Sequence, residues 1–149
     1  MELEKEVMSQ LKSAMKSKNH DRLEALRAIR AAIINAKTAA DLKEMDEKTE
    51  MKLLQRLVKQ RLDSMQIFQS QNRPDLAEKE ETQARIISEF LPEQLSEEEI
   101  EKIVEEVIAQ TQAESMKDMG KVMGAVSEKT AGKADNKTIS VIVRRKLIS

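Results

Sequence analysis

The chain has 149 residues, of which 40% are hydrophobic and 36% charged, and its net charge is −1. This length fits one domain or two small ones that share a core, and the absence of cysteine excludes disulfides, thiolate metal sites and cysteine nucleophiles. No run of about 18 apolar residues is present to span a membrane, and the first residues lack the apolar stretch of a signal peptide. We therefore expect a cytoplasmic protein with no membrane partner.

The apolar residues up to Pro92 recur every three or four positions, a spacing typical of amphipathic helices. It predicts a first helix over about 2–17 and a second that ends near residue 37, with Asp21 as its cap. A loop over 38–47 then leads into a long helix that starts near Asp46 and includes Phe68. Pro74 suits the first turn of a fourth helix, and Pro92 stops it. These four helices are expected to pack on one another.

Pro92 marks the predicted boundary between an N-terminal helical domain, residues 1–92, and a C-terminal domain, residues 93–149. Ser96 and Glu99 have the Ser-x-x-Glu spacing of a capping box at the start of the next helix. A short helix is expected to start at Ser115, and Asp135 is expected to cap the last one. The sequence therefore predicts an all-α fold, with a bundle of about four helices followed by a three-helix subdomain.

The charges are strongly segregated along the chain. Residues 1–88 carry a net charge of +2, residues 89–114 a net charge of −8, and residues 115–149 a net charge of +5. Such a distribution creates local fields that the overall charge conceals. The basic C-terminal stretch is therefore the first place to look for an interaction surface.

The residues that catalysis usually requires are scarce. His20 is the sole histidine and is expected in a polar turn between helices, so it is a poor candidate for a catalytic triad or a metal site. No glycine-rich phosphate loop is present. The glutamate clusters at 78–81 and 97–101 are interpreted as solvated helix faces. We expect no catalytic residue, no metal and no cofactor.

Gly120 and Gly124 are unusual because they lie four residues apart inside a helical pattern. Each costs about 0.5–1 kcal/mol relative to alanine, so something is expected to compensate. One explanation is the close approach of another helix. The other is the close approach of a phosphate backbone beside Lys121, and the residues themselves leave both open.

Six motifs spread along the chain are distinctive when they are found together: Arg27–Ile33, Lys59–Ser64, Asn72–Ala77, Glu89–Ile100, Asp118–Val126 and Gly132–Asp135. They resemble motifs of the GatB/YqeY family, and the resemblance covers essentially the whole chain. The C-terminal part is similar to the tail domain of the tRNA-dependent amidotransferase B subunit, and the whole resembles the stand-alone YqeY-like proteins. One departure is Ser127-Glu128, where the family's tail often has an apolar or basic pair.

The resemblance implies two helical subdomains and a non-catalytic module that binds tRNA or another structured RNA by shape and phosphate contacts. The alternative is a protein–protein adaptor in which the acidic and basic helices pair with each other or with a partner. The resemblance also raises a glutamine-dependent carbon–nitrogen ligase activity, but this chain has neither an amidase signature nor an ATP-binding cradle. The candidate RNA-binding residues are Lys117, Gly120, Lys121, Gly124, Lys129, Gly132, Lys133 and Lys137.

Overall fold

The computed structural model describes residues 2–148 and confirms an all-α fold, with no strand among those residues. They form seven α-helices and one 3-10 turn, and they divide into two compact units, of which the first ends at Leu91 and the second begins at Pro92. The elements are α1 (Glu2–Ser17), α2 (His20–Ala39), α3 (Glu47–Ser70), α4 (Pro74–Ser88), α5 (Glu97–Thr111), η1 (Met116–Asp118), α6 (Met119–Lys129) and α7 (Asn136–Ile148).

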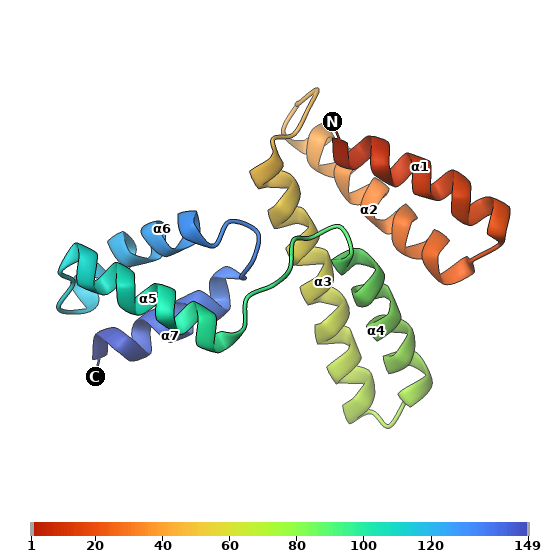
Figure 1. The fold of residues 1–149 in the computed structure, drawn as a ribbon. Coiled ribbons are helices and arrows are strands. Elements are labelled where there is room, and N and C mark those ends of the chain that lie inside the picture. The colour runs from red at the N-terminus through yellow and green to blue at the C-terminus, as the bar shows by residue number, and fades with distance from the viewer. Residues whose placement is uncertain (1, 149) are drawn as a thin grey trace. The chain divides into compact units, whose positions relative to one another are not determined.

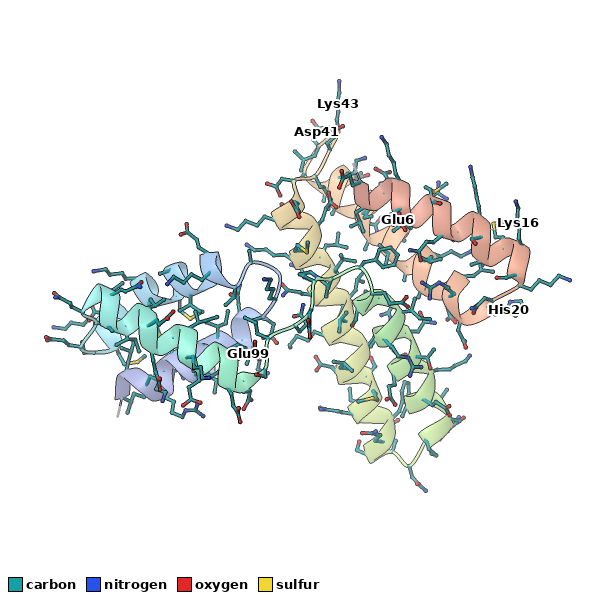
Figure 2. All side chains as sticks on the ribbon, in the orientation of Figure 1. Glu6, Lys16, His20, Asp41, Lys43 and Glu99 are labelled. Atoms are coloured by element: carbon teal, nitrogen blue, oxygen red, sulfur yellow. The ribbon has the colours of Figure 1, made fainter. Side chains whose placement is uncertain are left out.

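The first unit consists of two antiparallel helix pairs, α1 with α2 and α3 with α4 (Figure 1). Their apolar faces meet in a core of aliphatic side chains, which includes Val7, Leu26, Ile29, Leu54 and Ile87, each at most 1% exposed. Met45, in the loop before α3, is also buried in this core. That loop otherwise projects outward, with Asp41 and Lys43 extending from it (Figure 2).

The helix ends follow from local side-chain chemistry, with one correction. Asn19, not the predicted Asp21, caps α2, because its side-chain oxygen accepts a hydrogen bond from the backbone N–H of Arg22. Asp46 caps α3 in the same way through the backbone N–H of Thr49. Pro74 is the first residue of α4, where its missing N–H leaves no hydrogen bond unmade.

The second unit packs α5, α6 and α7 around a separate core, whose most buried members include Val104, Val122, Val126, Ile139 and Val143. The segment before α5 is tied to the turn after α6. The backbone N–H of Leu95 donates to the carbonyl of Lys133 at 2.8 Å, and the side-chain amide of Gln94 donates to the carbonyl of Gly132 at 2.8 Å. The turn between α6 and α7 is therefore held by the segment that leads into α5.

No helix between residues 2 and 148 is both long enough and apolar enough to cross a membrane.

Candidate nucleic-acid interface

The main candidate surface is the exposed side of α6 together with η1, the turn before it. Ser115 and Asp118 form a capping box, in which the Asp118 carboxylate accepts hydrogen bonds from the backbone N–H groups of Ser115 and Glu114. Lys117, Gly120, Lys121 and Gly124 are all exposed. Because they follow one another at helical spacing, they lie on one side of the segment. The structure thus brings together four of the eight predicted residues.

Acidic groups offset part of the positive charge on this side of α6. The pKa of Asp118 is lowered chiefly by its backbone hydrogen bonds, and then by the charges of Lys121 and Lys117, which therefore lie near its carboxylate. Glu128 is exposed one helical turn after Gly124, on the same side. The surface is therefore polar and mixed in charge rather than uniformly basic.

The two glycines of α6 face open space. Beyond the adjacent residues and local backbone of α6 itself, an added β-carbon at Gly120 or Gly124 meets no atom within 4 Å in the part of the chain that the structure describes. Close packing of another helix of the second unit therefore does not explain them. Because these glycines have no side chains, the backbone of α6 is exposed there, and an approaching molecule can contact it directly.

Gly132 and Lys133 lie in the turn after α6, away from the middle of that helix. Gly132 has a positive φ of 75°, which accounts for glycine at this position by backbone geometry alone. Lys133 is exposed, and it lines a small hollow together with Glu93 and Glu99. Glu99 lies at the start of α5, where it completes the capping box with Ser96 (Figure 2). The predicted capping box is confirmed, and it places carboxylates beside Lys133.

The two remaining predicted residues lie at the ends of helices. Lys129, at the end of α6, points toward α5, donating to the side chain of Gln110 at 3.3 Å and lying 4.0 Å from Glu106. Lys137, in the first turn of α7, is exposed. Lys129 is thus engaged within the unit, whereas Lys137 faces solvent.

The acidic helix α5 pairs with basic side chains of its own unit. Lys146 lies 2.7 Å from Glu101 and 2.8 Å from Glu105, and Arg145 lies 3.7 Å from Glu101. The pair lowers the pKa of Glu101 and raises the pKa of Lys146, in both cases mainly through the hydrogen bond between them. Part of the segregated charge seen in the sequence is therefore neutralised between α5 and α7.

The described residues show no arrangement that favours metal binding. No group of three or more His, Asp or Glu side chains among residues 2–148 is placed to hold a metal ion. His20 begins α2 at the exposed turn that follows α1 (Figure 2). A hollow of about 1010 Å³ between α1 and α3 has an apolar floor that includes Leu54 and Phe90, but its rim carries glutamates such as Glu6 and Glu47. These carboxylates disfavour a phosphate ligand there.

Sequence reasoning missed a group of basic side chains in the first unit. Lys48, Lys52 and Arg56 follow one another at intervals of four residues on α3, and Lys59 comes three residues later. The net charge of +2 over residues 1–88 concealed them, because acidic residues elsewhere in that stretch balance the sum. The regular spacing of these cations in the sequence was the signal that could have revealed them.

Comparisons with known proteins place the chain in a family. The family model described as "Yqey-like protein" matches residues 4–147. Two curated relatives carry the name "Altered inheritance of mitochondria protein 41, mitochondrial". The protein from Lachancea thermotolerans is 37% identical over 81 residues, which are 54% of this chain and 43% of the relative. The protein from Pyrenophora tritici-repentis is 38% identical over 82 residues, which are 54% of this chain and 44% of the relative. The matched part is thus less than half of the length of each relative. The family model, in contrast, matches nearly all of this sequence. The chain therefore belongs to the YqeY-like protein family.

Proposed function

We propose that this chain is a non-catalytic helical module that binds a structured RNA, and that the exposed side of α6 is its contact surface. The observation that carries the proposal is the pair of exposed glycines, Gly120 and Gly124, beside Lys117 and Lys121. A helix that gives up side chains at two exposed positions loses intrinsic stability. A ligand that needs to approach the backbone closely supplies a reason for that loss.

The kind of RNA recognition follows from the residues that are present. Lysines contact the phosphate backbone and carry little sequence information by themselves. The chain has only two aromatic residues, Phe68 and Phe90, both partly buried, so it offers few platforms for stacking splayed bases. Recognition of a folded RNA by its shape fits this composition. The resemblance to the tail domain of the tRNA-dependent amidotransferase B subunit points to tRNA as the first RNA to test.

The mixed charge of the α6 surface leads to an expectation about how this surface binds RNA. Lys117 and Lys121 are accompanied by Asp118 and Glu128, so few counterions are released when this surface meets RNA. Binding through α6 alone is therefore expected to depend on the fit of the exposed backbone against the RNA more than on net charge.

The test is a gel-mobility assay with bulk tRNA and micromolar full-length protein at low salt. We expect a shift for the unaltered protein and a loss of at least about tenfold in affinity for Gly124→Glu, which adds bulk and a negative charge to the open face. Because an added β-carbon at that position meets nothing within 4 Å beyond its neighbours and the local backbone of α6, the variant is expected to fold normally. Lys12→Glu in α1 is the control. Lys12 is also exposed, and its substitution likewise makes the net charge of the protein more negative.

An unchanged tRNA mobility at all protein concentrations would refute the proposal. The adaptor alternative would then be favoured if the protein retained a protein partner after nuclease treatment. The cytoplasmic location also stays a proposal, since the names of the two fungal relatives refer to mitochondria. Fluorescent tagging of the protein in its own cells tests the location directly.

A further inference from the structure

We propose that the exposed face of α3, in the first unit, carries a second RNA-contacting surface: a row of four cations that binds the phosphate backbone. We call it the α3 row, and it consists of Lys48, Lys52, Arg56 and Lys59. The choice of RNA as the polyanion rests on the proposed function. The location, the spacing and the charge of the row do not depend on it.

The geometry of α3 puts these side chains in a line. All four are exposed, whereas Leu54, on the opposite side of the helix, is 1% exposed and lies in the core of the first unit. Residues four apart lie above one another on a helix, about 6 Å apart along its axis. From the first to the last cation the row therefore extends about 16 Å along α3. Because α3 packs along α4, the row is held on a rigid support (Figure 1).

From Lys52 to Lys59 the row has little internal compensation of charge. Between residues 51 and 62 the sequence contains four basic residues and no acidic one. Lys59 forms an exposed pair with Asp63 at 3.5 Å, and Asp46, the capping residue of α3, lies at the start of the row. Two further acidic residues of the first turn, Glu47 and Glu50, flank Lys48 in the sequence. Lys48, Lys52 and Arg56 form no ion pair within residues 2–148. The part of the α3 row from Lys52 to Lys59 is therefore more uniformly basic than the α6 surface.

The surroundings of the row favour a nucleic acid over a lipid surface. A helix that lies on a membrane inserts an apolar face next to its cations. On α3, however, the large apolar side chains that are exposed, Leu62 and Ile67, lie beyond the row, and none lies between Lys48 and Lys59. Evenly spaced cations with polar neighbours such as Gln55 and Gln60 match a regular polyanion, because each cation can neutralise one phosphate of a continuous backbone.

The experiment measures the affinity of full-length protein for bulk tRNA as a function of salt concentration. Three triple variants each remove three positive charges by substitution to glutamine, a good helix former that should leave exposed helix faces intact. Circular dichroism checks that each variant is folded. The three variants are the α3-row variant (Lys48→Gln, Lys52→Gln, Arg56→Gln), the α6 variant (Lys117→Gln, Lys121→Gln, Lys133→Gln) and the control (Lys12→Gln, Lys16→Gln, Lys79→Gln).

For the α3-row variant we expect the slope of log affinity against log salt to decrease in magnitude by about 2 to 3, which is nearly one for each lost phosphate contact. At 0.1 M salt this corresponds to a loss of about five- to tenfold in affinity per contact. The control variant should keep the slope of the unaltered protein. Anionic vesicles of phosphatidylserine and phosphatidylcholine serve as the lipid probe, and no binding to them is expected.

The outcomes separate this inference from the proposed function. A loss confined to the α6 variant would overturn the α3 row and support the α6 surface. A loss confined to the α3-row variant would support the row and refute α6 as the contact surface. Equal losses in all three variants would indicate non-specific attraction and overturn the inference. Binding of the unaltered protein to vesicles but not to tRNA would also overturn it.

Discussion

Replacing Gly124 by alanine is expected to stabilise the second unit and, at the same time, to weaken RNA binding. Gly124 lies in the middle of α6, it has no positive φ, and an added β-carbon would contact nothing within 4 Å among the described residues. In such a position alanine is favoured over glycine by about 0.5–1 kcal/mol, because the unfolded chain loses less freedom and the helix is better shielded. Gly120, the second residue of α6, should give a smaller gain because first-turn N–H groups lack helical partners in any case.

The magnitude is large enough to measure. For a unit of this size, 1 kcal/mol corresponds to roughly 4–8 °C in melting temperature, so Gly124→Ala should raise the melting of the second unit by roughly 2–8 °C. Because both units are helical, circular dichroism alone cannot assign the change. Native-state hydrogen exchange of the amides in α5, α6 and α7, compared with those in α2 and α4, assigns it to one unit.

The reverse change at the neighbouring position is the matched control. Ala125 lies next in the same helix but is partly buried against the core of the second unit, so Ala125→Gly should lower stability by at least as much as Gly124→Ala raises it. A lower stability for Gly124→Ala would show that the glycine is needed in the folded chain, contrary to its open surroundings. Raised stability with unchanged tRNA affinity would contradict the close approach of RNA to the α6 backbone.

Three further predictions concern stability. Ser96→Ala removes the capping box of α5 and should cost about 1 kcal/mol, measured by urea denaturation; an equal loss for the exposed Ser9→Ala would deny a special role for the cap. Ile139→Ala, at 0% exposure, should cost about 2–5 kcal/mol and speed hydrogen exchange in the second unit, while equal effects in both units would contradict separate cores. The lowered pKa of Glu101 stabilises the folded state above pH 4.5, the ordinary value, and this contribution is lost as the pH falls through the lowered pKa. Acid titration of the second unit should therefore lose this step in Glu101→Gln, and an unchanged titration would refute the role of its pair with Lys146.

The structure also changes the interpretation of the basic C-terminal stretch. Its net charge of +5 in the sequence suggested a general cationic surface. In the folded unit, Lys129, Arg145 and Lys146 lie against glutamates of α5. Three of the eight cations of the C-terminal stretch are therefore paired with acidic groups of the same unit. Lys117, Lys121, Lys133 and Lys137 form no ion pair within residues 2–148. The acidic and basic helices of the second unit therefore pair with each other at Lys129, Arg145 and Lys146.

The sequence by itself determined the features that depend on neighbouring residues. Helical spacing predicted every α-helix, and the Ser96–Glu99 capping box, Pro74 in a first turn and Asp135 as a cap could be predicted because each acts within one turn of helix. The cap of α2 was placed two residues too late, because Asn19 and Asp21 are both good caps and the choice depends on where Lys18 turns the chain with a φ of 57°.

Only the tertiary structure decided which charges and which glycines are available to a partner. Lys146 and Glu101 are 45 positions apart in sequence and meet only because α5 packs on α7. Likewise, the spacing of Gly120 and Gly124 suited a packed helix as well as a bare surface, and the folded second unit shows that no other helix of that unit packs on them. Exposure and pairing depend on contacts between distant segments, and the order of residues along the chain does not specify these directly.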